Sequence, residues 1–352
     1  MKSLKCCKVV VFYLFFVFFS LAVAKDVKSE IISGLLEQMI VCGENESMSY
    51  YHIDAGKERI PFRPPPNMRL PSGSKMTVEG DKIGGKFVGK KINRLDDWNP
   101  PPNVTVGEQR TIILMSYCPD KPPPSTATRQ SIDYEAFDNT TTSLNAFYQE
   151  ASLDQNGNPQ IWFSGDTYGW YVLPHNSDEY DQSFDKIMED TIKVADPYVD
   201  FSKYDRMIIV VWDLFGYSAA YSHKLRFDTN DGIVWLSACF LNYDRFFMAG
   251  IKQHEMGHTF GDCWAHAGGV LLPENGFCKI GELINGLDGD EPCVVTTYFD
   301  NRDIMGNSSA YPLPSGWRKK KSGWLRPEQY LDVRENMTFW LDQRELLVVV
   351  SS

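Results

Sequence analysis

The apolar and polar residues of this 352-residue chain alternate with two different periods, which predict strands followed by helices. Short apolar runs bounded by polar residues indicate strands, and apolar residues three and four apart indicate helices. The predicted strands are 111–117, 160–172 (a strand or a hairpin around Gly165 and Gly169), 207–212 and 232–241, the last being expected as an edge strand. The predicted helices are 134–151, 181–195 and 244–261. This alternation indicates an α/β or α+β domain with a mainly parallel sheet.

The segments on either side of this region have weaker patterns. Residues 31–39 are predicted to form a short helix, and residues 76–92 a hairpin with its turn at Gly84-Gly85. Residues 337–341 and 346–350 are predicted strands. The expected organisation is a leader (1–24), an N-terminal β-rich segment or pro-segment (25–105), a main domain (106–326) and a short C-terminal β segment (327–352).

The first 24 residues have the features of a secretory signal peptide. Lys2, Lys5 and Lys8 form a basic head, residues 9–23 are almost wholly apolar, and Ala22-Val23-Ala24 offers a cleavage site. The alternative, an uncleaved membrane anchor, is disfavoured because the apolar run is short for a span. We therefore expect a secreted, monomeric protein that begins at Lys25 and has no stable membrane insertion after cleavage.

The chain is acidic, with a formal net charge of −11, and the leader removes three lysines and no acid. An acidic protein is a poor candidate for binding nucleic acid, so we expect no such partner. The one basic run, Arg318-Lys319-Lys320-Lys321, is interpreted as a solvated loop. Five N-x-S/T sequons, at Asn45, Asn103, Asn139, Asn307 and Asn336, are consistent with a secreted glycoprotein.

Six of the eight cysteines lie beyond the leader, namely Cys42, Cys118, Cys239, Cys263, Cys278 and Cys293. An even number in a secreted chain predicts three disulfides, with the pairing left open. Two of the six have alternatives. Cys42, in Val41-Cys42-Gly43, is placed to cap a metal ion in a latent form, and Cys263 is a possible ligand; a disulfide is preferred for both.

The strongest chemical signal is the tract His254-Glu255-Met256-Gly257-His258-Thr259-Phe260-Gly261. Residues four apart share one face of a helix, so His254 and His258 can bind one metal ion, and Glu255 can reach a water molecule on that ion. His266 follows soon after, and Gly261 can turn the chain to bring it in. The chain has six histidines, and His52, His175 and His223 are interpreted as structural or solvated, with a small chance that the last two line the cleft.

These residues resemble the metzincin clan of zinc endopeptidases, and more locally the gametolysin-like and immune-inhibitor-A-like secreted proteases. Asp303-Ile304-Met305-Gly306 stands where metzincins carry a tight Met-turn below the zinc. Further matching pieces are 107–110, 145–150, 199–205 and 323–325, so the resemblance covers roughly residues 105–326. It implies an α+β fold of metzincin type, with a mixed, mainly parallel sheet, an active-site helix and a Met-turn, between small β-rich flanking segments.

The chain departs from the family at the third ligand. The usual histidine stands three residues after the glycine, where this chain has Trp264, and His266 lies two residues later. The ligand role is therefore carried to His266, with Asp262 and Glu282 as alternatives. No tyrosine stands two residues after Met305, since that position is Asn307, and no tyrosine ligand is expected.

The expected function is that of a secreted zinc endopeptidase that cleaves extracellular proteins or glycoproteins. Zn²⁺ held by His254, His258 and His266 would lower the pKa of its water to about 7, and Glu255 would act as the general base. The alternative is a secreted binding or adhesion module with a degenerate, non-catalytic metal site. Glu255 favours the enzyme, because a structural site closed by four ligands does not need it.

Overall fold

The structure is a computed structural model of the chain. It describes residues 29–42, 47–56, 58–64, 73–83, 86–95, 102–140, 142–180, 183–214, 216–261, 264, 269–271, 294–296, 303–306, 311–333 and 347–350. The predicted leader, 1–24, lies outside these residues. No helix among the described residues is long and apolar enough to span a membrane.

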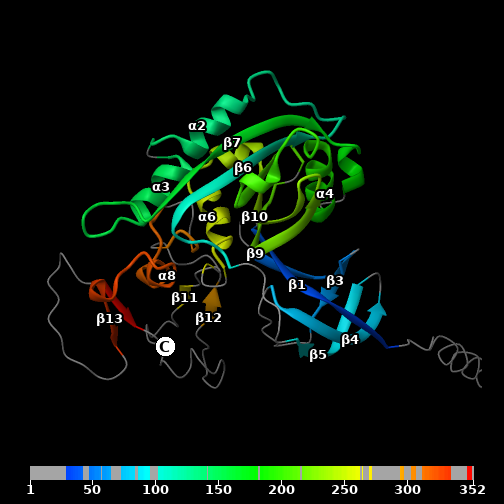
Figure 1. The fold of residues 1–352 in the computed structure, drawn as a ribbon, viewed down its shortest axis with the longest axis horizontal. Helices are drawn as coiled ribbons and strands as arrows, with labels where there is room; N and C mark the ends of the chain where they lie inside the picture. Colours follow the sequence, from blue (N-terminus) through cyan, green and yellow to red (C-terminus); the bar gives the residue numbers. More distant parts are fainter. Residues whose placement is uncertain are drawn as a thin grey trace, which may run out of the picture. The chain divides into compact units, whose positions relative to one another are not determined.

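Contacts divide the chain into two compact units. The first comprises Met1–Leu36, Tyr51–Leu70 and Ser74–Trp98, and the second comprises Glu37–Tyr50, Pro71–Gly73 and Asn99–Ser352. One strand, β1 (Glu30–Cys42), begins in the first unit and ends in the second (Figure 1). The predicted boundary near residue 105 is close to Asn99, where the chain passes from the first unit to the second. The second unit also contains the end of β1.

Five strands close into a small β-barrel. They are β1, β2 (Ser47–Asp54), β3 (Arg59–Arg63), β4 (Lys75–Ile83) and β5 (Lys86–Arg94), in the order β2-β3-β5-β4-β1 with a further pairing between β2 and β1. The predicted hairpin at residues 76–92 is confirmed as β4 and β5, which pair antiparallel. The interior of the first unit is apolar: Leu36, Ile53, Phe62, Met76, Val78 and Phe87 are all buried. Because β2 also pairs with β1, each of these five strands has a hydrogen-bonded neighbour on both sides.

In the second unit the sheet continues from β1 in the order β9-β10-β8-β6-β7. The strands are β6 (Gly107–Tyr117), β7 (Ile161–Val172), β8 (Arg206–Val211), β9 (Ser218–Thr229) and β10 (Gly232–Asn242). β6 pairs parallel with β7 and β8, and β10 pairs parallel with β8, whereas β9 is antiparallel to both β10 and β1. The predicted strands at 111–117, 160–172 and 207–212 are confirmed, and 160–172 is one strand.

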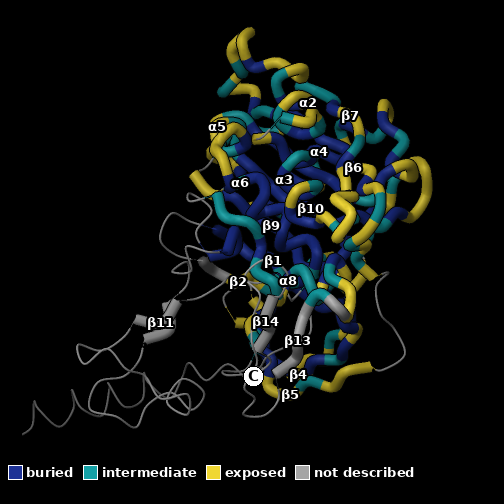
Figure 2. The backbone as a smooth tube through the Cα atoms, turned by 90° about the vertical axis from the view of Figure 1, so that its left-hand side faces the viewer, coloured by how far each residue is buried: buried dark blue, intermediate teal, exposed yellow. Residues whose placement is uncertain are grey.

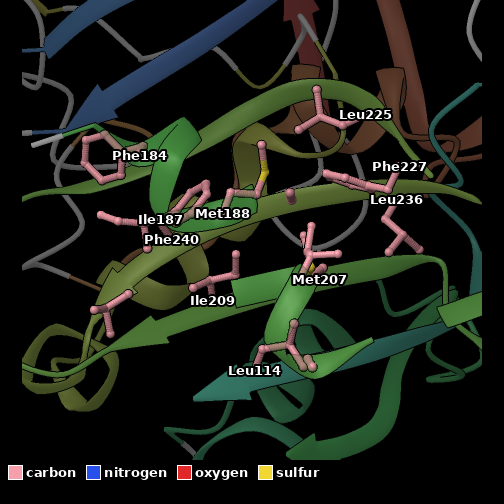
Figure 3. Packing of buried hydrophobic residues seen from close by; sticks show 14 of the residues in the cluster. Leu114, Phe184, Ile187, Met188, Met207, Ile209, Leu225, Phe227, Leu236 and Phe240 are labelled. Atoms are coloured by element: carbon pink, nitrogen blue, oxygen red, sulfur yellow. The ribbon is translucent and has the colours of Figure 1, made fainter. Parts of the chain in front are cut away.

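Both faces of this sheet are covered, and alternate residues of one strand enter two different cores. Ile112 and Leu114 of β6 lie in the core that contains α4, while Ile113 and Met115 lie in the core that contains α2, α3 and α6. Figure 3 shows the first of these cores, with Phe184, Ile187 and Met188 of α4 against the strands. Because the central strands are buried on both sides, they contain apolar runs without alternation, such as residues 112–115 of β6 and 207–211 of β8.

The helices among the described residues of the second unit are short. They are α2 (Arg129–Phe137), α3 (Leu144–Ala151), α4 (Phe184–Ala195), α5 (Tyr243–Phe247), α6 (Ile251–His258) and α8 (Gly316–Lys321). The helix predicted at 181–195 is confirmed as α4. The helix predicted at 134–151 is two helices, because Ser143 accepts a hydrogen bond from the Ala146 backbone N–H and so begins α3. Two small strand pairs complete the described chain: β11 (Gly269–Leu271) with β12 (Val294–Thr296), and β13 (Tyr330–Val333) with β14 (Leu347–Val350).

Two predictions about single elements were wrong: one element is of another type, and one lies at another place in the sheet. Residues 31–39 are strand rather than helix, because β1 is buried on both faces over much of its length and so shows a continuous apolar run without alternation. The strand predicted at 232–241 exists as β10, but it lies between β9 and β8 and has no edge to offer. β14 matches the predicted strand at 346–350, and 337–341 lies outside the described residues.

The expected fold class was also wrong. The chain is mostly β, with a closed five-stranded barrel and additional strands, rather than the mainly parallel α+β fold of the metzincin type. The error has a physical source: the sequence interpretation took residues 25–105 as an appendage, although they form the barrel and extend the sheet of the second unit through β1. Local periodicity does not show that strands so far apart in the chain will pair.

Candidate metal centre

The candidate site is built on α6, whose eight residues contain both histidines of the motif. The helix begins at Gly250, which has a φ of 86°, a conformation suited to glycine. The Gln253 side chain accepts a hydrogen bond from the Gly250 N–H at 3.1 Å and donates to the Thr142 carbonyl at 3.0 Å. The predicted helix from 244 is thus divided into α5 and α6. α6 is almost wholly buried (Figure 2), so its polar residues need internal partners.

A buried arginine holds the C-terminal end of α6. Arg206, at the start of β8, is 1 % exposed and donates to the Thr259 carbonyl at 3.3 Å and to Oε1 of Gln109 at 2.8 Å. Its guanidinium lies 4.4 Å from the centre of the Phe260 ring. Burial lowers the pKa of Arg206 to about 10, so it remains a cation at neutral pH. It therefore ties the turn that follows the helix to the sheet.

His254 and His258 meet as the sequence predicts. Their Nε2 atoms are 3.2 Å apart, and the side chains are buried, with His254 3 % and His258 0 % exposed. The Sγ atom of Cys42 completes a cluster, at 3.6 Å from Nε2 of His254 and 3.5 Å from Nε2 of His258. The ligand atoms of these three residues all lie within 4.8 Å of one another. Among the described residues, no other group of three such side chains comes together in this way.

The spacing of these three atoms fits a zinc ion. Tetrahedral Zn–N bonds of about 2.0–2.1 Å and a Zn–S bond of about 2.3 Å place two nitrogens about 3.3 Å apart and the sulfur about 3.6 Å from each. The observed separations are 3.2 Å between the nitrogens and 3.5 and 3.6 Å to the sulfur. Two imidazoles and a thiolate are also donors that zinc prefers. The residues present therefore fit the metal that the sequence predicts.

For Cys42 the sequence favoured a disulfide, with a role as a cap of the metal as the alternative. This residue ends β1, where residues Met39–Cys42 pair antiparallel with β9, Cys42 standing opposite Ser218. That pairing brings it to α6 from 212 positions away in the chain. The disulfide expected for Cys42 is wrong, and so is the set of three disulfides, because Cys42, Cys118 and Cys239 are all thiols. Cys118 and Cys239 are buried in cores, and burial raises the pKa of both.

Glu255 lies beside the cluster in a buried position, 1 % exposed. Its Oε2 atom has no hydrogen-bond partner among the described residues. Burial raises the pKa of Glu255 to about 8, and a hydrogen bond with Cys42 works in the opposite direction. An unpaired buried carboxyl oxygen is costly, so it indicates a missing partner such as a cation or a water molecule.

Below α6 the chain makes a tight turn at Asp303–Gly306, closed by a hydrogen bond from the Gly306 N–H to the Asp303 carbonyl at 2.8 Å. Met305 of this turn is buried against the helix: a Cβ added to Gly257 would stand 2.6 Å from its Sδ and 2.9 Å from the Trp264 ring. Trp264 donates from Nε1 to Oγ of Ser322 at 2.9 Å. It occupies the position of the family's third histidine as a core residue.

The remaining ligand candidates fall elsewhere. His266, Asp262 and Glu282, the three predicted options for the third ligand, lie outside the described residues. His175 is on the surface, 3.4 Å from Glu179, and His223 is buried on β9; neither belongs to the cluster. His52 is buried in the first unit. The structure thus brings together His254, His258 and Glu255 and adds Cys42.

Compared with known proteins, the chain matches no protein-family profile and no curated protein sequence.

Proposed function

We propose that the chain is a secreted zinc-dependent endopeptidase that hydrolyses peptide bonds of extracellular proteins. The observation that carries the proposal is the position of Glu255. A buried carboxyl group with an unpaired oxygen lies beside two imidazoles and a cysteine sulfur whose spacing suits zinc. The leader at residues 1–24 supports the secreted location.

The residues divide the chemistry between them. His254 and His258 would hold the metal through Nε2, and His254 is oriented by the Ile304 carbonyl, 2.9 Å from its Nδ1. A bound zinc ion supplies a Lewis acid and acidifies water. Glu255 accepts the proton of the attacking water at its carboxylate and returns it to the departing amine. A nearby cation favours the ionised carboxylate that this role requires, against the effect of burial.

Cys42 closes the site in the state described here. Its sulfur contacts both imidazoles and forms a hydrogen bond with Glu255. If His254 and His258 held a zinc ion, the Cys42 sulfur would take up the coordination position that a substrate water needs. We propose that this arrangement is a latent form, and that hydrolysis begins when the end of β1 withdraws from the ligands.

The alternative function is a binding or adhesion module with a structural metal site. The thiolate favours this alternative, because structural zinc sites are closed and rich in cysteine. Metal analysis together with turnover of an unstructured protein distinguishes the two. Zinc at one ion per chain with cleavage, in the wild type or after Cys42 is replaced by alanine, supports the enzyme; zinc without cleavage in both forms supports the module. A chain that binds no zinc contradicts both.

A further inference from the structure

The Asp303 carboxylate joins the tight turn at Asp303–Gly306 to the start of α8 and to the Arg318 side chain. Oδ1 of Asp303 accepts from the Met305 N–H at 2.8 Å, and Oδ2 accepts from the Ser315 N–H at 3.1 Å. The Nε of Arg318 donates to both oxygens, at 3.0 and 2.8 Å. Both side chains are buried, 2 % exposed for Asp303 and 6 % for Arg318. Buried ion pairs seldom add much stability by themselves, so a role in fixing geometry must be considered.

The peptide between Ile304 and Met305 connects this pair to the metal centre. A trans peptide is planar, and its N–H and C=O point in opposite directions. The N–H of this peptide is held by Asp303, and its carbonyl lies 2.9 Å from Nδ1 of His254. Fixing the N–H therefore aims the carbonyl at the histidine.

The carbonyl in turn determines which nitrogen of His254 carries the proton. A carbonyl oxygen can only accept, so the bond requires a proton on Nδ1. The lone pair of a neutral imidazole is then on Nε2, the atom that faces His258 and Cys42. If the carbonyl lost this orientation, the His254 ring could rotate and its proton could move to Nε2.

We propose that Asp303 and Arg318 are positioning residues for the metal centre, which set the orientation and tautomer of His254 through the Ile304–Met305 peptide. Arg318 belongs to α8 and opens the basic run that was interpreted as a solvated loop; this member of the run is buried and paired. The inference rests on the proposed function only in that it takes the cluster to be a metal centre. Outer partners of ligating histidines typically contribute about 10–100-fold in metal affinity.

The test measures zinc affinity of the full chain by competition with a chromophoric chelator. Asp303→Asn and Arg318→Gln are expected to lower the affinity about 10–100-fold, and Arg318→Lys to lower it less. Glu135→Gln is the matched control, because it breaks another buried ion pair on α6, between Lys252 and Glu135 at 2.9 Å. Lys321→Gln changes an exposed cation of α8. Both controls should retain wild-type affinity.

A second measurement separates positioning from stability. Nitrogen-15 NMR of the metal-free chain should show the Nδ1–H tautomer of His254 in the wild type and in Glu135→Gln, and a mixture of tautomers in Asp303→Asn and Arg318→Gln. Wild-type affinity and a single tautomer in Arg318→Gln, with only a lower unfolding temperature, would overturn the proposal. If these two variants do not fold, Arg318→Lys decides by the same two readouts. A wild type that binds no zinc refutes the proposed function, while the tautomer still tests the positioning role.

Discussion

The Sγ atom of Cys42 lies 3.5 Å from Nε2 of His258, although 216 positions separate the two residues along the chain. The contact unites the last residue of β1 with the last residue of α6. It makes Cys42 part of the candidate metal centre.

Replacing Cys42 by alanine should activate the protein. If the Cys42 sulfur blocks the attacking water, as proposed, its removal should raise cleavage of an unstructured protein at least about tenfold, equivalent to about 1.4 kcal/mol. Cys118→Ala, which removes a buried thiol from another core, is the control and should leave the rate unchanged. Loss of both zinc and cleavage in Cys42→Ala would instead make Cys42 an essential ligand.

Glu255→Gln should keep zinc and lose hydrolysis. The amide fills the same space but cannot accept a proton, and loss of a general base typically lowers the rate by about 10²–10⁴-fold. The comparison is best made in the Cys42→Ala background, where the site is open. Turnover close to that of the single variant would remove Glu255 from the mechanism.

The metal-free protein should be most stable at mildly acidic pH. Burial raises the pKa of Glu255 from 4.5 to about 8, so the free energy of unfolding falls as the pH rises through this window. Burial lowers the pKa of His254 from 6.5 to about 4, so the same free energy also falls as the pH drops from 6.5 toward 4. The two contributions leave a maximum between about 4.5 and 6.5.

Urea unfolding in the presence of a chelator, repeated across this pH range, measures the effect. In Glu255→Gln the free energy of unfolding should no longer fall as the pH rises, but it should still fall as the pH drops from 6.5 toward 4. An unchanged alkaline slope in that variant would show that another group is responsible.

Gly257→Ala should destabilise the protein even though alanine is the better helix former. A Cβ at this position would stand 2.6 Å from Met305 Sδ and 2.9 Å from the Trp264 ring. Overpacking typically costs about 1–3 kcal/mol, more than the gain of about 1 kcal/mol in helix propensity. Gly216→Ala, where no atom lies within 4 Å, is the control. Thermal unfolding checks the difference, and equal melting temperatures would contradict the packing described.

The unreduced protein should contain at least three thiols. Cys118 and Cys239 are buried and their pKa values are raised, so both should resist alkylation in the native state and react once the chain is denatured. Cys42 should become reactive when zinc is removed, if the end of β1 opens. Mass spectrometry after alkylation without reductant counts them; protection of all three in the denatured chain would restore the disulfide interpretation.

The parts of the site that the sequence predicted are those that local spacing determines. His254 and His258 are four residues apart on a helix, and Glu255 stands between them, so their common face follows from helix geometry alone. The tight turn at Met305 was recognised from a short motif and is present. For Cys42 a disulfide was preferred to its alternative role as a cap of the metal, because its place depends on the pairing of β1 with β9, a contact that no local pattern records.

The same limit explains the fold. β9 was not predicted, because it is buried along most of its length while its sequence includes Ser222, His223 and Lys224. β1 was taken for a helix, since a strand buried on both faces has no period of two. With both strands missing from the prediction, the continuity of the sheet from β1 through β9 to β10 could not be inferred, and neither could the barrel.

The pairing of Met39–Cys42 with β9 involves only four residues, so its stability can depend on the concentration of an ion that Cys42 helps to bind. A ligand that binds only one state stabilises that state in proportion to the logarithm of its free concentration. A zinc ion held by Cys42 as well as by His254 and His258 would have one more ligand than an ion held by the two histidines alone, so it would favour the state in which the end of β1 is in place. The ambient concentration of the ion would thus help to set how tightly this short piece of backbone is held.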